Sequence, residues 1–163
     1  MRQFEIDVSG EDLLSKNYTI CVADRNGLIK GFKFGEEFIK ILSSKYGQGL
    51  YKYPKSQRGK ALFKVRVYSI VIYYLFKSIK IREDISLTIC RDFQGKENDI
   101  KENLKFFLDK LLNLNVDNKI DFTRLDNDSN AHKYAYLMRK DSKNQLPNYI
   151  KLSLKEIEQY LQK

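Results

Sequence analysis

The sequence has few of the residues that build the common metal and nucleophile sites. Its 163 residues include only two cysteines and one histidine. No CxxC pair, zinc-ligand spacing or serine–histidine–aspartate pattern occurs, so zinc-finger and serine-triad chemistry find no support. Cys21 and Cys90 both lie in stretches that we predict to be buried strands. We therefore expect both thiols to be small core residues of a protein in a reducing compartment.

Long apolar segments and targeting signals are absent as well. The most apolar run, residues 65–76, is too short and too interrupted to span a bilayer. No signal peptide is visible at the N-terminus. Gly31 and Gly35 lie in a strand-like stretch and do not form a nucleotide-binding glycine loop. These absences predict a cytoplasmic protein with no membrane partner.

Positive charge and aromatic side chains are abundant. Lysine and arginine number 30 against 21 acidic residues, which gives a formal net charge of +9. Such a surface suits nucleic acids, anionic membranes or acidic proteins. The eleven tyrosines and ten phenylalanines suit base stacking, and they suit a hydrophobic core equally well. The length predicts a single domain over residues 1–163, with a core at 3–142 and a C-terminal helical extension at 143–163.

Hydrophobic patterning predicts an α/β fold. We expect strands at residues 3–8, 17–23, 28–34, 85–89 and 119–125, and helices at 36–46, 61–79, 98–112, 129–138 and 153–162. Asn26-Gly27 predicts a tight hairpin between the second and third strands, with positive φ values in a two-residue turn. The order of elements predicts a five-stranded mixed sheet ordered 3-2-1-4-5, its second strand antiparallel, with helices on both faces.

One carboxylate stands out in the first strand. Asp7 lies in the second half of an apolar strand, where an unpaired charge costs several kcal/mol. A metal ion is the commonest partner that offsets this cost. The alternative is that Asp7 caps a turn with Ser9 and Gly10 or is solvated at the strand end. Both interpretations stay open from this stretch alone.

Two further residues fall where the predicted topology brings strand and helix ends together. Asp92 follows the 85–89 strand, so its carboxylate and that of Asp7 would point into one crevice. Their repulsion would be relieved by Mg²⁺ or Mn²⁺. His132, at the start of the 129–138 helix, would ligate a metal or shuttle a proton. The alternatives are that Asp92 caps the helix after Gly95 and that His132 is a surface residue.

These features together resemble the ribonuclease H-like superfamily. The resemblance rests on the order of elements, on Asp7 and Asp92, and on the helix start Asn130-Ala131-His132-Lys133-Tyr134-Ala135, and it covers most of residues 3–142. The last helix of that fold often begins with an Asn-x-x-Ala-Asp-like motif whose acidic residue ligates metal. His132 holds the matching position, similar to the Asp-Asp-His sites of Argonaute Piwi domains and of the UvrC endonuclease domain.

The resemblance implies a metal-dependent nuclease acting on single-stranded DNA or RNA. The start Ile6-Asp7-Val8-Ser9-Gly10 also resembles a small group of archaeal proteins with this fold, for which single-strand exonuclease activity is suggested. In a two-metal mechanism Asp7 would bridge both ions and Asp92 would bind one. His132 would bind the other ion or protonate the leaving group.

One departure from the family concerns its first long helix. Ribonuclease H carries a glutamate there, whereas residues 58–79 contain no acid. Lys60, Lys64 and Arg66 are present instead, and they would offset phosphate charge. Glu11 is the nearest substitute metal ligand, with Asp128 second.

A basic, aromatic loop precedes that helix. Tyr51, Tyr53, Lys55 and Arg58 would follow a nucleic-acid backbone and stack on bases, or the loop would be a solvated connector. Two other functions stay open beside the nuclease. The first is a non-catalytic nucleic-acid-binding module, which the missing glutamate favours. The second is an interaction subunit whose basic surface meets an acidic protein.

Overall fold

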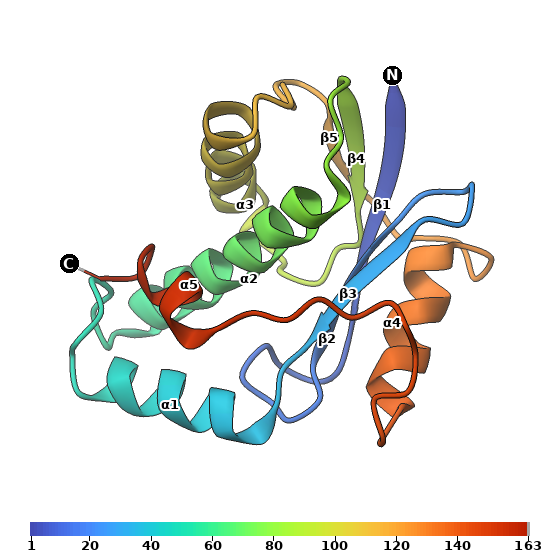
Figure 1. The fold of residues 1–163 in the computed structure, drawn as a ribbon. Helices are drawn as coiled ribbons and strands as arrows, with labels where there is room; N and C mark the ends of the chain where they lie inside the picture. The colour runs from blue at the N-terminus through green and yellow to red at the C-terminus, as the bar shows by residue number, and fades with distance from the viewer. Residues whose placement is uncertain (163) are drawn as a thin grey trace.

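A computed structural model describes residues 1–162 of the chain as a sheet with helices packed against it (Figure 1). The strands are β1 (Arg2–Ser9), β2 (Thr19–Ala23), β3 (Ile29–Lys33), β4 (Ile85–Ile89) and β5 (Ile120–Phe122). The helices are α1 (Glu36–Gly47), α2 (Gln57–Ile79), α3 (Glu97–Leu104), the π-helix Lys105–Leu111 that continues α3, α4 (Asn130–Lys140) and α5 (Leu154–Glu158). The order of strands and helices agrees with the order predicted from the sequence.

The sheet has the order β3-β2-β1-β4-β5. β2 is antiparallel to both β1 and β3, whereas β4 is parallel to β1 and β5 is parallel to β4. The predicted mixed sheet is therefore confirmed. Loops at residues 10–18 and 24–28 join the three antiparallel strands, and helical crossovers join the parallel ones.

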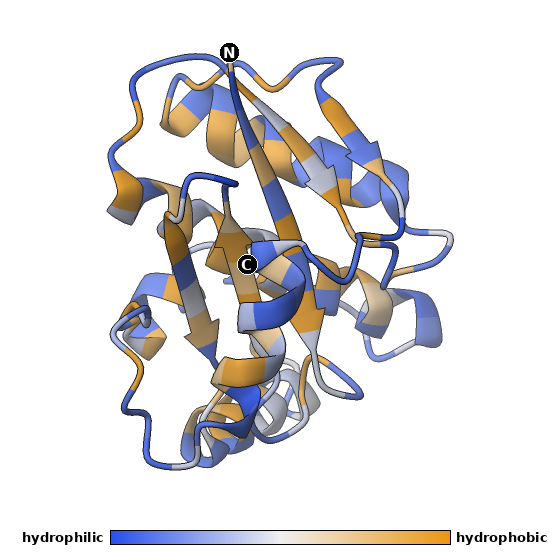
Figure 2. Ribbon diagram, turned by 90° about the vertical axis from the view of Figure 1, so that its right-hand side faces the viewer, coloured by the Kyte–Doolittle hydropathy of each residue, from blue (hydrophilic) through white to orange (hydrophobic). Residues whose placement is uncertain are grey.

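The two faces of the sheet meet different helices. α1, α2 and α3 lie on one side and α4 lies on the other (Figure 1). Apolar and polar residues alternate along β1 and β4 (Figure 2), and Phe4 and Ile6 of β1 join the main core. Asp7 and Ser9 point to the opposite face, where they bond to His132 and Arg139 of α4. This alternation places Asp7 beneath α4.

α2 is the central helix of the core. Most of its 23 residues from Phe63 onward are buried, which is why its sequence is apolar on nearly every face. It begins at Gln57, four residues before the predicted start at 61, because the Ser56 side chain accepts the Gly59 N–H and caps the helix. No helix among residues 1–162 is long and apolar enough to cross a membrane.

Two local predictions were wrong. The hairpin after β2 is not a two-residue turn, because only Gly27 has positive φ and the Asp24 N–H bonds to the Leu28 carbonyl. The helix predicted at 98–112 changes to π geometry at Lys105, which leaves Phe107 and Leu108 buried. The structure gives no physical reason for that change.

The C-terminal segment crosses the sheet edge before it joins the core. The Ile150 N–H donates to the Gly31 carbonyl and the Gly31 N–H donates to the Asn148 carbonyl, both at 2.9 Å. Beyond this crossing, α5 buries Ile157, and the nearly buried Glu158 bonds to Lys45 and Tyr51. The segment after residue 142 is thus packed on the same sheet and core as the rest of the chain.

Candidate metal centre

Asp7 is a buried carboxylate that lies inside β1. Only 3% of the residue is exposed, and its neighbour across the antiparallel ladder is Cys21. Its Oδ1 accepts the N–H of Val8 at 2.7 Å, and its Oδ2 accepts from Nδ1 of His132 at 2.9 Å. A solvated strand end, the alternative interpretation, is therefore excluded.

Asp92 reaches Asp7 from the neighbouring parallel strand. β1 and β4 pair Ile6 with Ile89, and the Cys90 N–H donates to the Ile6 carbonyl at 3.0 Å. The Asp92 N–H then donates back to the Cys90 carbonyl at 2.9 Å, which closes a tight turn. The donor atoms of Asp7, Cys90 and Asp92 all lie within 4.8 Å of one another. The two carboxylates that the sequence placed together do meet.

Cys90 is the member of this group that sequence reasoning missed. We predicted a core thiol, and Cys21 is one, but Cys90 is only partly buried and faces both carboxylates. The sequence did contain a signal, because Ser86, Thr88 and Cys90 share one parity. Side chains two residues apart in a strand point to the same face.

The carboxylates of Asp7 and Asp92 bring negative charge into the group, and among the described residues no lysine or arginine side chain is paired with them to balance it. Asp92 is itself exposed at the edge of the group, but partial desolvation and then the charge of Asp7 raise the pKa of Asp92 to about 6. Burial raises the pKa of the Cys90 thiol to about 11, although a hydrogen bond from the Leu125 backbone partly opposes the shift. Within residues 1–162, no lysine or arginine forms an ion pair with Asp7 or Asp92. A divalent cation fits this set of oxygen and sulfur donors.

His132 lies beside the group without belonging to it. Its ring is half-exposed, and because Nδ1 donates to Asp7, Nε2 remains for solvent or a ligand. The start of α4 fixes this position, since the Ser129 side chain accepts the His132 N–H. The predicted proximity of the His132 and Asp7 side chains is therefore observed.

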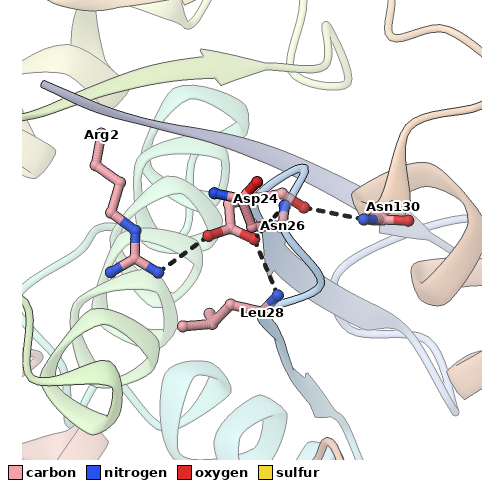
Figure 3. Close-up of polar contacts among 5 residues, drawn as sticks. All are labelled: Arg2, Asp24, Asn26, Leu28 and Asn130. Carbon is pink, nitrogen blue, oxygen red and sulfur yellow. Dashed lines mark hydrogen bonds and ion pairs between the residues drawn. The ribbon is translucent and has the colours of Figure 1, made fainter.

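A second contact anchors the start of α4 to the β2–β3 loop. Figure 3 shows Asn130 donating through its side-chain amide to the Asp24 carbonyl, at 3.0 Å. The nearly buried Asp24 carboxylate in turn accepts the N–H groups of Asn26 and Leu28 and pairs with Arg2 at 3.0 Å. The loop thus holds a fixed shape beneath the helix that carries His132.

A pocket of about 400 Å³ opens beside Asp92. Its walls come from the loop after β1, the first half of α2 and the loop after β4. Lys60, Lys64 and Lys96 line it, and Lys64 pairs with Asp12 at 2.8 Å. Glu11 is exposed on its wall and is not among the three clustered donors. Asp128, the other substitute ligand, is exposed and also outside the donor group.

Two predicted nucleic-acid contacts are structural residues instead. Tyr51 is 2% exposed, stacks on Phe63 and donates to Glu158 at 2.9 Å, so it has no free face for a base. Arg66 donates to the Tyr160 carbonyl and to Asn103, and its guanidinium lies over Phe107. Both expectations are therefore wrong.

The other residues of the basic loop have mixed surroundings. Tyr53 is partly buried, with its ring centroid 6.2 Å from that of Phe63. Lys55 and Arg58 are exposed, as is Lys60 one turn further into α2. These three cations stay available to a polyanion.

The chain matches no protein-family model, no curated protein and no solved structure in the comparisons made.

Proposed function

We propose that the protein is a metal-dependent nuclease that hydrolyses phosphodiester bonds of single-stranded DNA or RNA on a ribonuclease H-like fold. The observation that carries the proposal is the meeting of Asp7 and Asp92. Their carboxylates come within 4.8 Å at the ends of adjacent parallel strands, next to a pocket lined by lysines. Carboxylates so placed repel each other unless a cation lies between them.

The topology supports the fold assignment. β1 lies at the centre of the sheet, antiparallel to β2 and parallel to β4, and α4 begins beside its end. The resemblance to the ribonuclease H-like superfamily implies this arrangement, with acidic residues on the first and fourth strands and a third ligand at the start of the last helix. Asp7, Asp92 and His132 hold these positions.

The chemistry divides among the residues of the site. Bound Mg²⁺ or Mn²⁺ would supply an activated water and charge stabilisation for phosphodiester hydrolysis. Asp7 and Asp92 would hold the cation. His132 keeps Nε2 free, because Nδ1 donates to Asp7, and exchanges a proton with the leaving oxygen. Lys60 and Lys96 in the pocket offset the charge of the phosphate backbone.

The test is a cleavage assay with labelled single-stranded DNA, single-stranded RNA and a hybrid, each with Mg²⁺, Mn²⁺ or EDTA. Wild type should cleave at least one substrate only with metal, and Asp7→Asn should lose that activity. Asp117→Asn is the matched control, since this exposed carboxylate pairs only with Lys105 on the surface. Cleavage that persists in Asp7→Asn would refute the assignment.

A second candidate function is binding of nucleic acid without cleavage. It is favoured by α2, which presents lysines where the family carries glutamate, and by the hydrogen bond that already satisfies Asp7. Salt-sensitive binding with no metal-dependent cleavage of any substrate would select this function over the first.

A further inference from the structure

We infer that the Cys90 thiolate is a third metal ligand, which raises the affinity of the site for Zn²⁺ or Co²⁺ relative to Mg²⁺. This inference rests on the metal site of the proposed function and adds a sulfur donor to it. It begins from the three-donor group itself. In this group, Sγ of Cys90 and one carboxylate oxygen each of Asp7 and Asp92 all lie within 4.8 Å of one another.

The sheet register holds Cys90 in this place. Ile6 and Ile89 are partners in the parallel ladder, so the next residues, Asp7 and Cys90, come side by side. The turn that follows brings Asp92 back toward them through its bond to the Cys90 carbonyl. All three donors thus come from backbone that is fixed by hydrogen bonds. Donors of one tetrahedral ion lie about 3.5 Å apart, given metal–ligand distances of about 2.0–2.3 Å.

The surroundings of the thiol suit ligation. Cys90 is only partly buried, and its sulfur lies beside the carboxylates of Asp7 and Asp92. On binding, the S–H proton passes to solvent and the sulfur electron pair is donated to the cation, so one proton is released per ion bound. Thiolate is a soft ligand that favours Zn²⁺ and Co²⁺, whereas Mg²⁺ takes oxygen donors.

The chain contains its own control. Cys21 also neighbours Asp7, as its partner in the antiparallel ladder on the other side. Its side chain, however, is completely buried with Ala135 and Met138, and it is not part of the donor group. Two cysteines therefore flank the same carboxylate on adjacent strands, and only Cys90 is placed to bind.

The experiment is a Co²⁺ titration of the full chain, followed by absorption spectroscopy. Wild type and Cys21→Ala should develop a near-ultraviolet sulfur-to-cobalt charge-transfer band that saturates at one equivalent, and Cys90→Ala should develop none. Calorimetry should show Zn²⁺ affinity at least tenfold weaker in Cys90→Ala. A band missing from wild type, or one that persists in Cys90→Ala, would overturn the inference.

A second measurement avoids any folding defect of the variant. In wild type, Zn²⁺ should slow the reaction of the partly buried Cys90 thiol with a disulfide reagent, whereas Mg²⁺ should not. Equal rates with and without Zn²⁺ would also overturn the inference. These outcomes separate it from the nuclease proposal. A cobalt–thiolate band without cleavage supports the ligand and refutes the activity. Cleavage with Mg²⁺ and no such band supports the activity and refutes the ligand.

Discussion

Replacement of Asp24 should destabilise the protein, because this buried carboxylate is the acceptor of several hydrogen bonds. Asp24 is 3% exposed, and its carboxylate accepts from Asn26, Leu28 and Arg2 at 2.9–3.0 Å (Figure 3). Asp24→Ala leaves two backbone N–H groups and the Arg2 guanidinium without their partner. Asp24→Asn keeps an oxygen for the loop and loses the charge and the bond from Arg2.

The magnitude follows from these contacts. A hydrogen bond to a charged group contributes about 1.5–3 kcal/mol, but the loop N–H groups can regain water. The Arg2 side chain is one-third exposed, so its ion pair is screened and contributes about 1 kcal/mol or less. We expect the free energy of unfolding to fall by about 2–4 kcal/mol in Asp24→Ala and by about 1 kcal/mol in Asp24→Asn.

The same carboxylate predicts a pH dependence. Burial alone would raise the pKa of Asp24, but hydrogen bonds from Leu28, Arg2 and Asn26 outweigh it and lower the pKa below its usual value. A carboxyl group whose folded pKa is lowered stabilises the fold above its unfolded pKa, which is about 3.9. That contribution is lost as the pH falls through the folded pKa. The difference between wild type and Asp24→Asn should therefore be constant near neutrality and shrink below about pH 4.

The assay is urea unfolding followed by circular dichroism at neutral and acidic pH, with Asp126→Ala as a control at an exposed carboxylate. If Asp24→Ala unfolds at the same urea concentration as wild type, the hydrogen bonds to the loop contribute nothing net. In that case the loop is not what holds α4 in place.

Three further predictions concern the site and the core. Asp7→Asn should unfold at the same or a higher temperature than wild type in EDTA, because a buried charge is removed; clear destabilisation would show that its bond to His132 dominates. Lys60→Glu should weaken binding of single-stranded nucleic acid and lower the slope of log affinity against log salt, measured by fluorescence anisotropy, whereas no change would place the strand elsewhere. Tyr51→Phe should cost about 1 kcal/mol in urea unfolding through its lost bond to Glu158, while nucleic-acid binding stays unchanged.

The sheet could be predicted because its signals are local. Asn26-Gly27 marked the hairpin, and the 85–89 strand was found with its true bounds because turn-forming and apolar residues delimit it. The meeting of Asp7 and Asp92 then followed from strand order alone, since the ends of adjacent parallel strands share one edge. Nothing more detailed than topology was needed for that step.

The surroundings of single side chains could not be predicted in this way. Arg66 and Lys64 are two residues apart on one helix, yet one is held against Phe107 and the other lines the pocket. Tyr51 looked like a loop aromatic because its core partners, Phe63 and Glu158, are distant in the sequence. Which face of a helix or loop is covered depends on packing that a sequence pattern does not contain.

The crossing of the C-terminal segment over β3 also affects whether a strand of another chain can pair with this edge of the sheet. An open sheet edge exposes a row of N–H and C=O groups that can pair with a strand of another chain. At the β3 edge, residues Asn148 and Ile150 occupy the donor and acceptor of Gly31. At the other edge, β5 is only three residues long and offers little to pair with. The partly covered β3 edge and the short β5 edge both disfavour the addition of a strand from another chain.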